Sequence, residues 1–117
     1  MELRDLVDAL LRRDTLAARQ WVADAARRGL SWSQLPSPEG LPPVGRAVAA
    51  GVVELMASRA GQPAPAWASA VPASPTRVFL VRGAETMPRL RRLCEEEGPA
   101  PLRKRGILAP PEFLTWA

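Results

Sequence analysis

The chain has 117 residues, a net charge of +4, a single cysteine and no histidine. The lack of histidine excludes histidine-dependent acid–base, triad and metal chemistry, and one cysteine excludes an intramolecular disulfide and multi-cysteine zinc sites. The sequence also contains no phosphate-binding glycine loop or other catalytic signature, so we expect no enzyme, no cofactor and no metal.

The length fits one domain that spans residues 1–117. The first residues alternate charged and apolar side chains, unlike a secretory signal, and no apolar run approaches the ~20 residues that a membrane span requires. We therefore expect a cytoplasmic protein without a membrane partner.

Two amphipathic patterns predict a helical hairpin over residues 2–28. The apolar residues of the first pattern recur with the period of one helix face; they are Leu3, Leu6, Val7, Leu10 and Leu11. Asp14 is a capping residue, and a second apolar face follows it and ends in two arginines before Gly29. A continuous helix through Asp14 is the alternative.

Prolines divide the middle of the chain. The stretch "SWSQLPSPEGLPP" breaks regular structure, and its last two prolines suit the first turn of a third helix over residues 43–60. Residues 62–76 form a proline-rich connection. Aromatic residues usually attach such segments to a core, so we expect four side chains to be at least half buried: Trp21, Trp32, Trp67 and Trp116.

A fourth helix is expected over residues 86–97, with Thr86 as its cap and Pro88 in its first turn. Before it, the short apolar run "RVFLV" (77–81) fits either a strand or a buried extended segment. Cys94 shares a helix face with Leu90 and Leu93, so we interpret it as a core residue rather than a nucleophile.

Two groups of cations flank the three consecutive glutamates 95–97. Arg89, Arg91 and Arg92 on the fourth helix are candidates for nucleic-acid binding through phosphate neutralisation. The glutamates argue against this role, as does the lack of a recognition-helix pattern or a series of aromatic residues for base stacking. A solvated or protein-facing surface is the better interpretation.

Residues 99–117 combine prolines, cations and many large apolar side chains, which predicts an ordered C-terminal arm. Leaving each large apolar side chain exposed would forgo about 1.5–3 kcal/mol of burial, so this core or another chain should cover them. The candidate partner-binding residues are Arg103, Lys104, Arg105, Phe113, Leu114 and Trp116. The cations are expected to face an acidic partner surface or carboxylates of the same chain.

Three stretches carry a resemblance: "LLRRDTLAARQWVADAARRGLSW", "GQPAPAWASAV" and, above all, "EEEGPAPLRKRGILAPPEFLTWA". They resemble a family of short uncharacterised bacterial proteins that are encoded beside minimal nucleotidyltransferases of toxin–antitoxin pairs. The resemblance implies an antitoxin-like role in binding a protein partner, and it implies no catalytic residue.

These observations predict a mainly α-helical domain of about four helices, with proline-rich loops, at most one short strand and the ordered arm. The expected function is non-enzymatic: binding and restraining a nucleotidyltransferase-type toxin, the product of an adjacent gene. The alternative is a small basic nucleic-acid-binding regulator. A homodimer that forms through the apolar arm is a third possibility.

Overall fold

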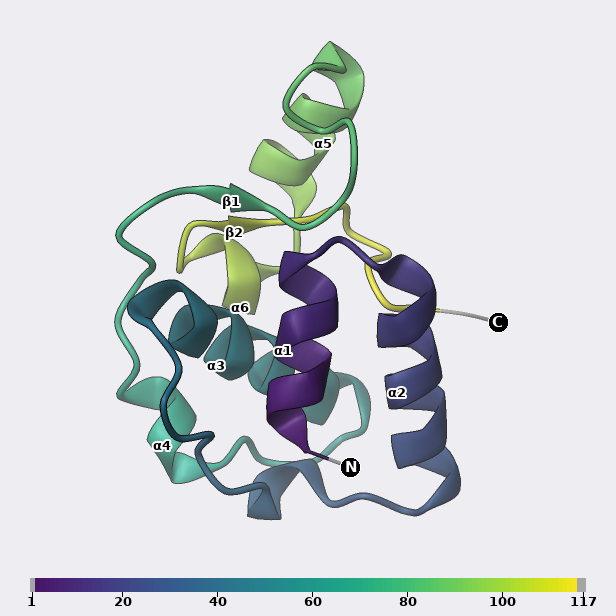
Figure 1. Ribbon diagram of the computed structural model, residues 1–117, viewed down its shortest axis with the longest axis vertical. Coiled ribbons are helices and arrows are strands. Elements are labelled where there is room, and N and C mark those ends of the chain that lie inside the picture. The colour runs from purple at the N-terminus through teal and green to yellow at the C-terminus, as the bar shows by residue number, and fades with distance from the viewer. Residues whose placement is uncertain (1, 116–117) are drawn as a thin grey trace.

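The computed structural model describes residues 2–115, in which helix predominates, as expected (Figure 1). The α-helices are α1 (Leu3–Leu11), α2 (Thr15–Arg27), α3 (Pro43–Arg59), α4 (Ala66–Ser69), α5 (Pro88–Glu97) and α6 (Ala100–Arg103). A 3-10 turn, η1 (Trp32–Gln34), and the strands β1 (Val78–Phe79) and β2 (Ile107–Leu108) complete the fold. The sequence did not reveal α4 and α6, because four residues are too few to show a helical period.

Helices α1 and α2 form the expected antiparallel hairpin and lie side by side (Figure 1). Arg13 takes a left-handed φ of 59° in the turn, which rules out a continuous helix. The Asp14 carboxylate accepts a hydrogen bond from the Ala17 amide at 3.1 Å and so caps α2. The apolar face of α1 is buried against α2 and α3.

Helix α3 occupies the centre of the molecule and contacts α1, α4 and α6. It is buried on nearly every side from Ala47 to Ala57, with Glu54 as the partly exposed exception. Gly51 allows α6 to approach closely, because a Cβ atom there would lie 2.6 Å from Cδ2 of Leu102. The helix begins at Pro43 as expected and ends one residue before the expected boundary.

Tryptophans hold the proline-rich loops in place. The Trp67 ring nitrogen donates to the Leu35 carbonyl at 2.8 Å, and that of Trp21 donates to the Glu2 carbonyl at 3.0 Å. Trp32 is buried, and Trp21 and Trp67 are largely buried, which confirms the expectation for these three residues. Trp116 lies outside the described residues.

The two short strands pair in parallel, with Val78 opposite Ile107 and Phe79 opposite Leu108. The sequence predicted at most one strand, so the second is a correction. Strand β2 has only two residues, which are too few to show the alternation of apolar and polar side chains that distinguishes a strand from a buried loop. Only the tertiary fold brings the two segments together.

Helix α5 begins at Pro88, not at residue 86, and Thr86 does not cap it. Thr86 instead lies in a turn before the helix, where its amide and the Met87 amide both donate to the Gly83 carbonyl, at 3.1 and 2.9 Å. Figure 1 shows α5 projecting from one end of the longest dimension of the molecule. A small cluster separate from the main core attaches it: Phe79, Ala84, Cys94 and Leu108, with Leu90 beside them.

The C-terminal arm is ordered, as expected, through residue 115. It contains α6 and β2 and then crosses the main core, to which it contributes Leu102, Ile107, Ala109, Phe113 and Leu114. The arm therefore packs on its own chain.

Candidate protein-binding surface

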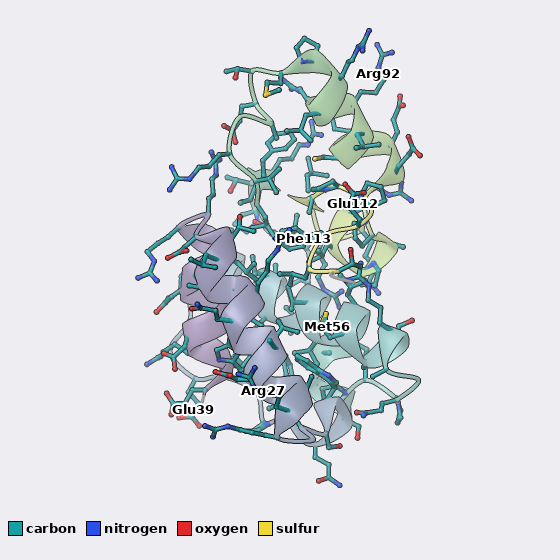
Figure 2. All side chains as sticks on the ribbon, turned by 90° about the vertical axis from the view of Figure 1, so that its right-hand side faces the viewer. Arg27, Glu39, Met56, Arg92, Glu112 and Phe113 are labelled. Carbon is teal, nitrogen blue, oxygen red and sulfur yellow. The ribbon has the colours of Figure 1, made fainter. Side chains whose placement is uncertain are left out.

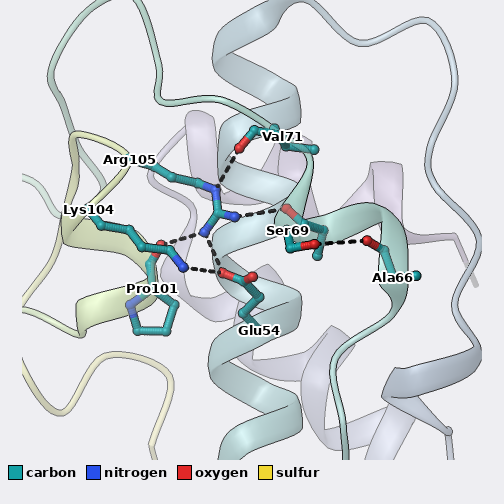
Figure 3. A network of polar contacts seen from close by, with 8 residues as sticks. Glu54, Ala66, Ser69, Val71, Pro101, Lys104 and Arg105 are labelled. Carbon is teal, nitrogen blue, oxygen red and sulfur yellow. Dashed lines mark hydrogen bonds and ion pairs between the residues drawn. The ribbon is translucent and has the colours of Figure 1, made fainter.

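Arg105, one of the predicted partner-binding cations, lies inside the molecule with only 3% of its surface exposed. Its guanidinium forms an ion pair with Glu54 of α3 (Figure 3). It also donates to the carbonyls of Ala68 at 2.8 Å, Pro101 at 3.0 Å and Val71 at 3.4 Å. Arg105 thus connects α3, α4 and α6, and its donors are occupied by the protein's own acceptors.

Lys104 and Arg103 stand beside this network but are exposed. The Lys104 ammonium lies 3.2 Å from Glu54 Oε1, and Arg103 donates to the backbone carbonyl of Glu96. Glu54 is therefore the intramolecular carboxylate that meets two of the arm's cations, Lys104 and Arg105. Both exposed side chains are accessible to a partner.

Phe113 and Leu114 are 5% and 4% exposed and belong to the main core. Arg59 at the end of α3 donates to the Phe113 carbonyl at 2.6 Å and to the Pro111 carbonyl at 3.4 Å, which fixes the arm over the core. The structure therefore places Arg105, Phe113 and Leu114 in the interior of the chain. Trp116, the remaining predicted contact of the arm, is outside the described residues.

The three arginines of α5 divide between two faces. Arg91 turns toward the body, where it lies 5.9 Å from the centre of the Phe79 ring and 3.4 Å from Glu95. Glu95 also accepts from Arg77 at 2.6 Å, and this hydrogen bond, with a further one from Arg91, keeps the pKa of Glu95 below its usual value. Arg89 and Arg92 are exposed on the other side of the helix.

The outer face of α5 brings positive and negative side chains together around one apolar residue. A shallow hollow of about 230 Å³ is lined there by Pro88, Arg89, Arg92, Leu93, Glu96 and Glu97. Figure 2 shows Arg92 near the tip of α5, away from the body of the molecule. We call the set Arg89, Arg92, Leu93, Glu96 and Glu97 the outer face of α5.

Helical spacing explains this arrangement. Residues 89, 93 and 96 follow one another at i, i+4 and i+7, so they form one ridge, and Arg92 lies beside it. Three consecutive glutamates point in different directions around a helix, and of the three it is Glu96 that shares the ridge with Arg89. The spacing itself was the signal that could have found it.

The charges of α5 run opposite to the helix dipole. A helix is stabilised by acidic residues in its first turn and basic residues in its last turn. Helix α5 has neither: its arginines occupy the first half, and Glu95, Glu96 and Glu97 close it. Within residues 2–115, the charged side chains of the outer face also form no ion pair.

Other features of the described residues lie away from α5 or inside the core. An open hollow of about 600 Å³ lies between the start of α1 and the loop 35–40, lined by the charged residues Glu2, Arg4 and Glu39 together with leucine, proline, serine and glycine. Burial, together with the negative charges of Glu112 and Glu95, raises the pKa of Cys94 and so disfavours its reactive thiolate. No group of metal-ligating side chains is found among residues 2–115. In the same range, no helix has the length and apolar character needed to cross a membrane.

Comparisons of the chain with protein-family models, with curated proteins and with solved structures each found no match.

Proposed function

We propose that this protein is a non-enzymatic module that binds another protein through the outer face of α5. One observation carries the proposal: α5 projects from the body, and its outer-face charges oppose the helix dipole and form no ion pair within residues 2–115. Side chains that lower the stability of their own helix are better explained by a binding role than by folding.

The composition of the outer face favours a protein over a nucleic acid. Glu96 and Glu97 line the same hollow as Arg89 and Arg92, and they would repel the phosphates that the arginines attract. Leu93 offers an apolar centre within a charged rim, which is the usual anatomy of a protein–protein contact. A small nucleic-acid-binding regulator remains the alternative function, and it depends on the same arginines.

The first partner to test is the product of an adjacent gene. The resemblance to short proteins encoded beside minimal nucleotidyltransferases supports such an enzyme as the partner, which this chain would restrain as an antitoxin in the cytoplasm. Arg103, which is exposed and donates to the Glu96 carbonyl of α5, adds a further positive charge beside the outer face.

The test is co-purification of the full chain with the adjacent gene's product, followed by titration calorimetry. The double variant Arg89→Glu/Arg92→Glu should bind at least about tenfold more weakly, since charge reversal turns complementary contacts into repulsive ones. The matched control is Arg19→Glu/Arg28→Glu, which makes the same charge change at exposed positions of α2 and its end. This control should bind like the wild type.

Equal affinities for the wild type and the α5 variant would overturn the assignment of the binding face. A parallel titration with duplex DNA distinguishes protein binding from the alternative function, nucleic-acid binding. If the wild type binds DNA with steeply salt-dependent affinity and binds no protein, the nucleic-acid function replaces the proposed one.

A further inference from the structure

The outer face of α5 is complementary to itself. Its arginines, Arg89 and Arg92, lie in the first half of the helix, its glutamates, Glu96 and Glu97, lie in the last turn, and Leu93 lies between them. A two-fold axis near Leu93 would turn one copy of the helix into an antiparallel partner of the other. Such an axis brings the same surface of both copies together, as in most homodimers.

The residue numbers show which side chains would meet. In an antiparallel pair centred on residue 93, position 89 faces position 97 of the second copy, and a shift of half a residue places it opposite position 96. Arg89 of each copy would therefore face a glutamate of the other, and the two-fold axis would produce this contact twice. Packed helices lie about 8–10 Å apart, a separation that arginine and glutamate side chains can span.

The same pairing corrects the unfavourable electrostatics of the single helix. The negative last turn of one α5 would lie against the positive first half of the other, so Arg89 and the glutamate that faces it each gain a partner of opposite sign. The two helix dipoles would also run antiparallel. Leu93, which is partly exposed in the monomer, would lie next to its symmetry mate and lose contact with water.

We propose that, in the absence of its protein partner, the chain forms a two-fold symmetric homodimer through antiparallel pairing of α5. The inference rests on the proposed function, because both use the outer face of α5. One copy of the chain therefore cannot be in the homodimer and in the complex with its protein partner at the same time. A contact between two ten-residue helices buries less than the roughly 1,200 Å² of a standard interface, so the dimer should be weak and concentration-dependent.

Sedimentation equilibrium of the purified full chain over about a hundredfold range of concentration tests the proposal. The wild type should shift from monomer toward dimer as concentration rises. Two charge-reversed chains, Arg89→Glu/Arg92→Glu and Glu96→Arg/Glu97→Arg, should each remain monomeric, because the charges that face one another across the axis then have the same sign. Circular dichroism and tryptophan fluorescence check that both are folded.

Mixing the two charge-reversed chains in equal amounts is the decisive step. One then has a fully negative outer face and the other a fully positive one, so the mixture should form a one-to-one heterodimer although neither chain dimerises alone. The control Arg19→Glu/Arg28→Glu should dimerise like the wild type. A mixture that stays monomeric, or a wild type that is monomeric throughout the range, would overturn the proposal.

Failure here is distinguishable from failure of the proposed function. A monomeric wild type whose binding to the adjacent gene's product is lost on charge reversal of Arg89 and Arg92 would refute the homodimer and support the proposed function. A wild type that dimerises through α5 and does not bind the adjacent gene's product would support the homodimer and refute the proposed function. If both hold, adding the partner should convert the homodimer into a complex with one copy of each chain.

Discussion

The guanidinium of Arg105 is buried against the carboxylate of Glu54, and this ion pair connects the C-terminal arm to the central helix α3. Three backbone carbonyls accept the remaining hydrogen bonds of Arg105 (Figure 3). A buried charge of this kind stabilises a fold only while its partners remain in place. The predictions below follow from this pair, from the packing of the arm and from the charges of α5.

Replacing Arg105 with methionine should lower the free energy of unfolding by about 3 kcal/mol, because it leaves the Glu54 carboxylate and three carbonyls without their main donor. This loss of stability lies at the lower end of the range for breaking a buried ion pair, because Lys104 still pairs with the Glu54 carboxylate in the variant. Urea denaturation followed by tryptophan fluorescence measures the change. The matched control Lys104→Met removes an exposed cation and should cost less than about 1 kcal/mol. Equal losses in the two variants would contradict the structural role of Arg105.

The pKa of Glu54 predicts how stability depends on pH. Burial opposes ionisation of this carboxyl group, but the hydrogen bonds and charges of Arg105 and Lys104 outweigh burial and hold the pKa below its usual value. The unfolded chain, with a glutamate pKa of about 4.3, therefore binds the proton more tightly than the folded protein. The contribution of Glu54 is present above about pH 4.3 and is lost as the pH falls through the lower folded-state pKa.

Measuring the free energy of unfolding against pH for the wild type and Glu54→Gln checks this prediction. The wild type should be the more stable protein at neutral pH, and the difference should narrow as the pH falls below about 4.3. The exposed Glu39 provides the control, because Glu39→Gln makes the same change outside the network. A difference between wild type and Glu54→Gln that stays constant across this window would show that Glu54 titrates as in the unfolded chain.

Phe113 tests whether the arm is part of the core. Phe113→Ala should destabilise the protein by about 3–5 kcal/mol, since it removes a buried aromatic ring and leaves a cavity. Deleting residues 110–117 removes both Phe113 and Leu114 and should unfold the domain. Thermal unfolding monitored by circular dichroism measures both changes, with Glu112→Ala as the exposed neighbouring control. A truncated chain that unfolds cooperatively at the wild-type temperature would show that the arm is dispensable.

Gly51 should reverse the usual effect of a glycine-to-alanine change in a helix. Such a change ordinarily stabilises a helix interior by about 1 kcal/mol. In α3 the added Cβ would lie 2.6 Å from the buried Leu102 side chain and 3.2 Å from the Pro101 carbonyl oxygen, so α6 would have to shift. We expect Gly51→Ala to destabilise by about 1–3 kcal/mol in denaturant titrations. Gly45→Ala in the same helix, whose nearest neighbour is a side-chain atom at 3.3 Å, should be better tolerated.

Arg89 should show a trade-off between stability and binding. Arg89→Glu places an acidic residue in the first turn of α5 and should raise the free energy of unfolding by about 0.3–1 kcal/mol through the helix dipole. The same substitution should weaken binding through the outer face. Denaturation and calorimetry on one preparation measure both quantities, with Arg19→Glu in the middle of α2 as control. A loss of stability in Arg89→Glu would indicate that the arginine supports the fold rather than a contact.

The sequence by itself determined the helical class and most of the boundaries of the four longer helices. The apolar period in α1, the capping Asp14 and the prolines that begin α3 and α5 act over a few neighbouring residues, so they can be recognised locally. It was also predictable that the proline-rich loops are ordered. Their large aromatic side chains would remain exposed to water if these segments were disordered, and the free energy gained by burying them would be lost.

Only the tertiary structure decided what the cations and the arm contact. Arg105 and Arg103 are two residues apart and chemically alike, yet one is buried against Glu54 and the other is exposed. That difference depends on α3 and α4, which lie far away in the sequence and supply the acceptors. Strand β2 likewise exists because β1 lies beside it. Burial and pairing are set by segments that meet only after folding, and no local pattern encodes which segments meet.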